Sequence, residues 1–189
     1  MGWLQSPIEA ASTQHQALNA PVFFWGTRLH ELAQGRGPGS NAGMRFHVFV
    51  IGKPKLDFAR LGVEEYAARL RPYVPLELHY LKAGTQAGES LALLERSKAM
   101  FRIVLDERGE QVSSRGLALK FAAWEMHGPR DLAVLIGGAD GHTDALRQAA
   151  GWRWALSKLT LQHEMALVLT LEQLYRACTL RAGHPYHRD

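Results

Sequence analysis

From residue 44 onward, short apolar runs alternate with longer segments in which apolar residues recur at helical spacing. Leu132–Ile136 is an unbroken apolar run, which is typical of a strand buried on both faces of a sheet. Phe46–Ile51 and Phe101–Leu105 are predicted to form two further strands. The segment Leu76–Leu81 alternates, which predicts a strand with one face partly wet. Another short strand is expected from Trp152. The residues Asp106–Gly109 (DERG) predict a turn that closes the third strand.

The segments between these strands carry apolar stripes that predict helices. In the first, Ala59, Val63, Tyr66 and Leu70 share one face, and Asp57 is a suitable N-cap. The predicted helices span 57–71, 88–99, a segment capped by Ser113 or Ser114 and stopped by Gly128-Pro129, 143–150, and 163–180. Strands alternating with helices predict an α/β fold, a mostly parallel sheet with helices on both faces.

The last helix has two apolar stripes, which is more than one sheet face covers. One contains Leu167, Leu171, Leu174 and Cys178, and the neighbouring one contains Met165, Val168, Tyr175 and Thr179. Either the helix is sunk in a large core or its second stripe meets another subunit. At this chain length the second arrangement is favoured.

Residues 1–43 differ from the rest, because Pro, Gly, Ser, Gln and Asn are frequent and no strand or helix period is present. We expect a disordered extension or a misassigned translation start, since Met44 opens the first convincing strand. The single domain is then residues 44–189.

Composition places only weak limits on the binding partners and the cellular compartment of the protein. The chain has 189 residues, of which 47% are hydrophobic and 21% charged, and its formal charge of +4 is compatible with an RNA partner without requiring one. No apolar run approaches the roughly 20 residues of a membrane span, and no secretory signal is evident. One cysteine, Cys178, excludes a disulfide framework within the chain. We expect a cytoplasmic protein.

Two loops are the first candidates for chemistry. Gly137-Gly138-x-x-Gly141 follows a buried strand, where glycines permit close approach of a ligand, although a structural turn explains it equally well. It is neither a Rossmann fingerprint nor a Walker A motif. Ser157–Gln162 (SKLTLQ) offers backbone groups beside apolar side chains, as a nucleoside site does, or it is an ordinary connection. Both loops together are predicted to wall one pocket.

The C-terminal segment RAGHPYHRD is the third candidate, because His184, Tyr186, His187 and Arg188 crowd into five positions. The two histidines lack a further ligand nearby, so no metal is expected there. The functional hypothesis is a cluster for acid/base chemistry and RNA contact.

The segments LIGGADGH, RWALSKLTLQHEM, LEQLYRA and HPYHRD, in this order, resemble the RlmH family. These are SPOUT-class methyltransferases that use S-adenosyl-L-methionine on bacterial large-subunit rRNA. The resemblance implies a homodimer whose C-terminal part forms a deep trefoil knot. It also implies methylation of N3 of a pseudouridine in 23S rRNA of the assembled ribosome, without metal or membrane.

The resemblance also assigns roles to residues. It implies cofactor contacts at Leu105, Gly138, Ser157, Lys158, Leu159, Thr160, Leu161 and Gln162. As a hypothesis based on the C-terminal cluster, Tyr186, His187 and Arg188 are the candidate catalytic residues, and His184 and Arg176 the candidate substrate contacts. Ala139 and Gln162 replace prolines usual in the family, and His142 an apolar residue, so we expect looser pocket loops and altered cofactor affinity.

Two other functions remain open at this point. One is a knotted methyltransferase acting on another RNA, such as tRNA. The other is a ribosome-binding protein that has lost catalysis.

Overall fold

The computed structural model of this chain describes residues 43–184 and Tyr186. Apart from Gly43, the predicted extension at 1–43 lies outside the described residues, as do His187 and Arg188 of the C-terminal cluster.

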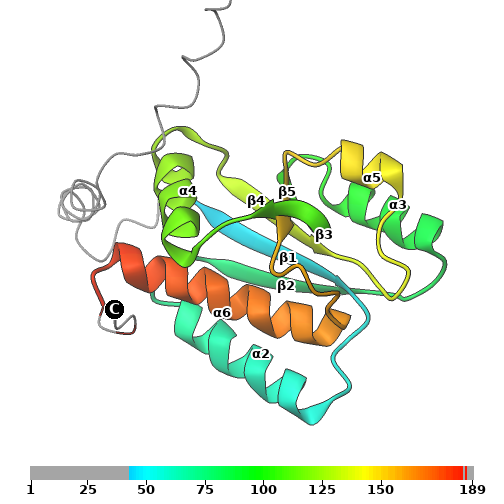
Figure 1. The fold of residues 1–189 in the computed structure, drawn as a ribbon, viewed down its shortest axis with the longest axis horizontal. Coiled ribbons are helices and arrows are strands. Elements are labelled where there is room, and N and C mark those ends of the chain that lie inside the picture. The colour runs from blue at the N-terminus through cyan, green and yellow to red at the C-terminus, as the bar shows by residue number, and fades with distance from the viewer. Residues whose placement is uncertain (1–42, 185, 187–189) are drawn as a thin grey trace, which may run out of the picture.

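Within the described residues, five strands form one sheet in the order β2-β1-β4-β3-β5, and every neighbouring pair is parallel. The two largely buried strands β1 and β4 lie side by side within it (Figure 1). The prediction of a mostly parallel sheet is therefore confirmed. The strands are β1 (Arg45–Ile51), β2 (Leu76–Leu81), β3 (Phe101–Gln111), β4 (Asp131–Ile136) and β5 (Trp152–Ala155).

Helices cover both faces of the sheet, as predicted. One face carries α2, α4 and α6, while α3 and α5 lie together on the other (Figure 1). The helices are α2 (Asp57–Leu70), α3 (Gln86–Arg96), α4 (Ser114–His127), α5 (Asp144–Gln148) and α6 (His163–Arg181).

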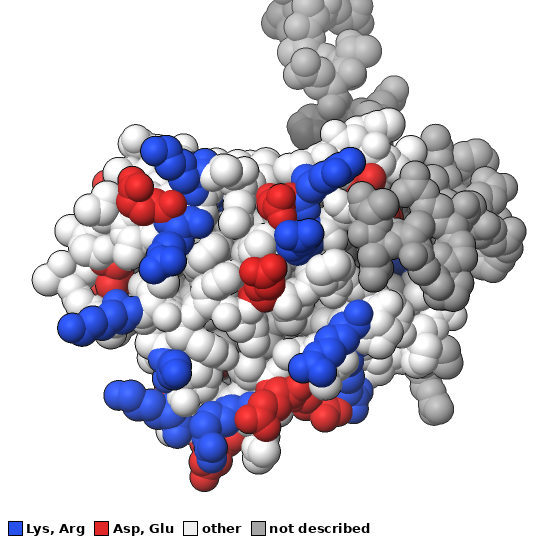
Figure 2. All heavy atoms as spheres, turned by 180° about the vertical axis from the view of Figure 1, so that it is seen from behind, with Lys and Arg blue, Asp and Glu red and all other residues white. Residues whose placement is uncertain are grey.

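Among the described residues, the face drawn in Figure 2 shows no single basic patch, because Lys and Arg are interspersed with Asp and Glu. The overall charge therefore does not outline an RNA-binding surface on this face. Among the helices that the structure describes, none is both long enough and apolar enough to cross a membrane.

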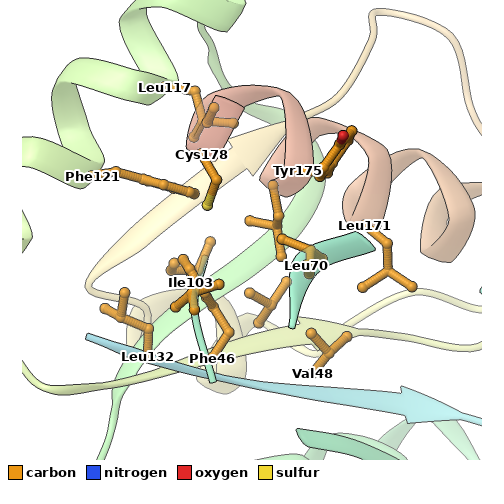
Figure 3. Packing of buried hydrophobic residues seen from close by; sticks show 14 of the residues in the cluster. Phe46, Val48, Leu70, Ile103, Leu117, Phe121, Leu132, Leu171, Tyr175 and Cys178 are labelled. Carbon is orange, nitrogen blue, oxygen red and sulfur yellow. The ribbon is translucent and has the colours of Figure 1, made fainter. Parts of the chain in front are cut away.

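The core is divided by the sheet into two layers, because side chains along a strand point alternately to opposite faces. In β1, Phe46 and Val48 belong to the larger cluster under α2, α4 and α6, whereas Phe49 belongs to the smaller cluster under α3 and α5. Cys178 of α6 points into the larger cluster beside Phe121 of α4 (Figure 3). Its burial raises the pKa of the thiol to about 12, so this cysteine is a packing residue.

The predicted turn at Asp106–Gly109 is wrong, because β3 continues through it to Gln111. Leu105 and Glu110 both pair with Trp154 of β5, so the intervening residues form an irregularity within the ladder. Pairing with a strand more than 40 residues later stabilises this segment, and local turn propensity does not reveal such pairing.

The predicted N-cap at Asp57 is also wrong. Leu56 occupies that position without a side-chain cap, and Asp57 is the first helical residue. The carboxylate of Glu164 instead accepts hydrogen bonds from the backbone N–H groups of Lys55 and Leu56, at 3.0 and 2.9 Å. These bonds tie the start of α2 to the start of α6.

The second apolar stripe of α6 is largely covered within this chain by α2, which lies alongside it (Figure 1). Tyr175 and Thr179 are buried, and the Tyr175 ring packs near that of Tyr66 of α2. Gly62 permits the close approach of the two helices, since a Cβ there would lie 2.9 Å from Val168. The stripe therefore does not by itself require a second subunit.

Candidate functional site

A pocket of about 320 Å³ opens at the carboxyl ends of β3, β4 and β5. The glycine turn after β4 forms one wall and the loop after β5 forms another, with Gly138 and Thr160 both among the lining residues. The prediction that these two loops wall one pocket is confirmed. The site lies at the sheet edge where α/β proteins bind ligands.

Six of the eight predicted cofactor contacts line this pocket: Leu105, Gly138, Ser157, Leu159, Thr160 and Leu161. The other two, Lys158 and Gln162, are exposed and are not among the lining residues. Gln162 caps α6, where its side-chain oxygen accepts from the N–H groups of Glu164 and Met165, each at 3.1 Å. The capping bonds stabilise the junction between loop and helix.

The glycine turn is packed too closely for side chains. A Cβ on Gly138 would lie 2.7 Å from Oε2 of Glu89, and one on Gly137 would lie 2.9 Å from the His142 ring. Glu89 is buried, and its Oε1 accepts from the N–H of Gly84 at 2.9 Å, so its carboxylate is held in place. The turn therefore exposes bare backbone to the pocket.

His142 supports the turn from beneath. It is buried, and its Nε2 lies 3.1 Å from the carbonyl oxygen of Leu105 at the pocket edge of β3. Burial lowers the pKa of His142, and this outweighs the hydrogen bond to Leu105 and the nearby Asp106, which act in the opposite direction. The imidazole is therefore neutral, and it donates to Leu105 through Nε2.

An ion pair closes the pocket beside α5. Arg147 Nε donates to Asp106 Oδ2 at 2.6 Å, and Asp106 also accepts from the N–H of Arg108 at 2.9 Å. Burial alone would raise the pKa of Asp106, but these two hydrogen bonds and the guanidinium charge hold it below its usual value. Asp106 is thus an anion lining the pocket.

A hydrogen bond between two lining residues joins β3 to the loop after β5. The hydroxyl of Thr160 donates to Oε2 of Glu107 at 2.6 Å. Asp106, Glu107 and Arg147 were not predicted as pocket residues from the sequence. The first two were expected in a turn that closes the third strand, and no local pattern connects them with Arg147. His142 was noticed only as an unusual residue; its position one residue after the glycine turn was the available signal.

The C-terminal cluster lies elsewhere in the same chain. Tyr186 packs against Tyr175 and over Arg176, and its hydroxyl is 3.4 Å from Oε1 of Glu172, all in the C-terminal half of α6. The pocket touches α6 near Ala166. Ten residues of helix separate Ala166 from Arg176, about 15 Å at 1.5 Å per residue. One chain therefore does not bring its own described tail residue to its pocket.

Tyr186 and Arg176 are fixed by each other and by Glu172. Arg176 donates to Glu172 at 2.6 Å, and its guanidinium lies 5.0 Å from the centroid of the Tyr186 ring. Burial, followed by a hydrogen bond with Tyr66, raises the pKa of Tyr186 to about 12. The phenol is therefore protonated at neutral pH. His184 is exposed.

Comparison with known proteins decides the family. Residues 44–187 match the model of the family described as "Predicted SPOUT methyltransferase". The chain belongs to this family. The SPOUT match begins where the first strand begins and leaves residues 1–43 outside it.

Several named relatives are similar over nearly their whole length. Ribosomal RNA large subunit methyltransferase H of Thermus thermophilus is 49% identical over 145 residues, which cover 77% of this chain and 99% of the relative. The protein of the same name from Deinococcus deserti is 47% identical, covering 77% and 100%. A weaker structural likeness, with a TM-score of 0.48 and 12% identity, involves a probable methylase family protein from Haemophilus influenzae and covers 77% and 70%.

Proposed function

We propose that this protein transfers a methyl group from S-adenosyl-L-methionine to N3 of a pseudouridine in 23S rRNA of the assembled bacterial ribosome. The observation that carries the proposal is the pocket between Gly138 and Thr160, in a SPOUT-family chain that is 49% identical to a ribosomal RNA large subunit methyltransferase H. The pseudouridine and its N3 atom come from the family resemblance. Such work on ribosomes places the protein in the cytoplasm.

The pocket residues suit an adenosine-bearing sulfonium compound. Leu105, Ile136 and Leu156 supply apolar surface for a purine, and the bare turn at Gly138 offers backbone hydrogen-bonding groups. Asp106 and Asp140 also line the pocket, and carboxylates suit both ribose hydroxyls and a positively charged ligand. The volume of about 320 Å³ lies within the range of small-molecule sites.

Methyl transfer depends chiefly on the alignment of the methyl donor with the acceptor nitrogen. Bound S-adenosyl-L-methionine supplies an activated methyl group on sulfur. The loop of Ser157–Gln162 and the turn at Gly138 would hold the cofactor, and a fixed position would allow its methyl group to be aligned with an incoming nitrogen. Because the N3–H of the base is only weakly acidic, a nearby base or cation assists its loss.

The C-terminal cluster is proposed to provide that assistance. Histidine is a common general base at neutral pH, so His187 is proposed to accept the proton. The pKa of Tyr186 is raised to about 12, so its phenol keeps its proton and is suited to donating a hydrogen bond. Arg188, His184 and Arg176 are proposed to hold phosphate or base. Arg176 lies over the Tyr186 ring, so the two are already placed as one unit.

The active unit is proposed to be a homodimer in which the tail of one subunit completes the pocket of the other. The separation of roughly 15 Å along α6 between Ala166 and Arg176 supports this arrangement. The trefoil knot of the C-terminal part is proposed with it, on the resemblance to the family.

The direct test uses 50S subunits and 70S ribosomes from a strain lacking this methylation, incubated with the protein and S-adenosyl-L-methionine. Mapping the methylated nucleotide should find one N3-methylpseudouridine in 23S rRNA, formed on 70S ribosomes. Methylation of tRNA alone would redirect the enzyme to another RNA. Cofactor binding without methylation of any RNA would favour a catalytically inactive ribosome-binding protein.

A further inference from the structure

A group of three possible metal ligands lies on the sheet away from the pocket. His47 of β1 and Glu77 of β2 are directly in register, and His79 is two residues after Glu77. Residues in register or two apart along a strand point to the same face, so the three side chains share one face of the sheet. This is the face under α3 and α5, because Phe49, two residues after His47, belongs to the cluster there. Parallel pairing therefore brings together residues about 30 positions apart in the sequence.

The ligand atoms converge on one point. Oε2 of Glu77 lies 3.4 Å from Nδ1 of His47 and 3.4 Å from Nε2 of His79, and the three atoms all lie within 4.8 Å of one another. Two bonds of about 2.05 Å at a tetrahedral angle place their ligand atoms about 3.4 Å apart. Two of the three edges thus already have the length that a tetrahedral Zn²⁺ site requires.

The two nitrogens are buried and unsatisfied. Nδ1 of His47 and Nε2 of His79 make no hydrogen bond to the described residues, although both are shielded from solvent. Buried polar atoms normally have a partner, and leaving one without a partner is costly. A cation at the point of convergence would satisfy both.

A second carboxylate orients His47 for this role. Oδ1 of Asp131, at the start of β4, lies 3.0 Å from Nε2 of His47. An Nε2–H donating to Asp131 leaves the lone pair of Nδ1 directed at the cluster. Zinc-bound histidines commonly have this carboxylate partner on the other ring nitrogen. Nε of Arg45 lies 3.9 Å from Oδ1 of Asp131.

The His79 ring is also held in place. It stacks on Phe49, with ring centroids 4.5 Å apart, and lies nearly parallel to the His47 ring at 5.8 Å. Packing therefore limits the reorganisation needed to bind an ion, which favours affinity.

We propose that His47, Glu77 and His79 bind a Zn²⁺ ion, with solvent as the fourth ligand. The bound ion joins β1 to β2, the edge strand whose hydrogen-bonded neighbour in the described sheet is β1. Its role is structural. The site lies near the amino-terminal ends of the strands, whereas the pocket follows Ile136. The five residue steps from Asp131 to Ile136 separate the two by roughly 16 Å. It is therefore independent of methyl transfer. The sequence analysis missed it because only His184 and His187 were considered as a pair.

The test is Zn²⁺ titration of the full chain, with Co²⁺ absorption as a probe of tetrahedral geometry. The wild type should bind one more ion than the Glu77→Ala/His79→Ala double variant, which alters the two more exposed ligands and leaves His47 intact. Asp131→Asn should weaken that binding about 10- to 100-fold, because it removes only the orienting partner. His127→Ala, which removes an exposed histidine at the end of α4, is the matched control and should leave binding unchanged.

Thermal unfolding provides a second readout. Saturating Zn²⁺ should raise the melting temperature of the wild type and of His127→Ala, but not that of the double variant. Equal Zn²⁺ stoichiometry and affinity in the wild type and the double variant would overturn the proposal, and so would an octahedral Co²⁺ spectrum in both.

Discussion

The buried imidazole of His142 and the carbonyl oxygen of Leu105 are joined by a 3.1 Å hydrogen bond, so the residue following the glycine turn is tied to the middle of β3. Both residues line the pocket, so the bond connects two of its walls. Because Nδ1 of His142 has no partner among the described residues, this one bond fixes the orientation of the ring. Because an imidazole gains a proton at low pH, the contribution of this residue to stability depends on pH.

The pH dependence of stability should reveal this contribution. The folded pKa of His142 is lowered below its unfolded value of 6.5, so the unfolded chain gains a proton first as pH falls. The contribution of His142 is thus fully present above pH 6.5 and decreases as pH falls toward the folded pKa. As pH is lowered from 6.5 toward the folded pKa, the unfolding free energy of the wild type minus that of His142→Leu should fall by up to about 1.4 kcal/mol per pH unit.

Denaturant unfolding of both proteins between pH 5 and 8 measures this difference. Subtraction removes most of the contribution of the other titrating groups, because both proteins contain them. A difference that stays constant throughout this pH range would show that His142 titrates alike in both states.

The Thr160–Glu107 hydrogen bond should contribute to cofactor affinity more than to stability. Thr160→Val removes the donor at 2.6 Å and frees the loop after β5, so S-adenosyl-L-methionine should bind about 3- to 10-fold more weakly, equivalent to roughly 1 kcal/mol. Glu107→Gln keeps an acceptor and should have a smaller effect. Calorimetric titration distinguishes the two, and equal losses in both variants would argue against the bond.

The two candidate tail groups should differ in effect. His187→Ala should lower the methylation rate by about 100-fold or more if its imidazole assists deprotonation. Tyr186→Phe should have a smaller effect, because the pKa of the phenol is raised to about 12 and it does not act as a base at neutral pH. Single-turnover rates on 70S ribosomes measure both. Unchanged rates in both variants would remove these residues from the chemistry.

Mixed dimers test whether the site is shared between subunits. A subunit with Gly138→Val lacks the pocket, and a subunit with His187→Ala and Arg188→Ala lacks the tail. Each mixed dimer assembles one complete site from its two intact halves, so it should recover about half of the wild-type activity. Differently tagged subunits allow the mixed species to be purified. Activity no higher than that of the parent variants would place pocket and tail in the same subunit.

Much of the fold follows from local sequence. The apolar runs of β1 and β4 and the Ser113 cap of α4 were predictable, because burial and capping leave local patterns. The extension of β3 past Leu105 was not, because it depends on pairing with Trp154 of β5. The covering of Tyr175 by α2 was equally non-local.

The site was predictable to a similar degree. The glycine turn and the loop after β5 were found because each directly follows a predicted strand, where α/β sheets bind their ligands. Asp106 and Arg147 lie 41 residues apart and become partners only through the fold. The His47–Glu77 pair likewise depends on the register of two parallel strands.

The central claim, that the Gly138 turn and the 157–162 loop bind the methyl donor, is tested most directly by one comparison. S-adenosyl-L-methionine is titrated into the wild type, Gly138→Ala and Gly84→Ala. The added methyl in Gly138→Ala meets the fixed Glu89 carboxylate at 2.7 Å, whereas a Cβ at Gly84 has nothing within 4 Å. Gly138→Ala should weaken binding at least 10-fold, and Gly84→Ala should bind as the wild type does, with one ligand per chain. Wild-type affinity in Gly138→Ala, or no binding by the wild type, would contradict the account.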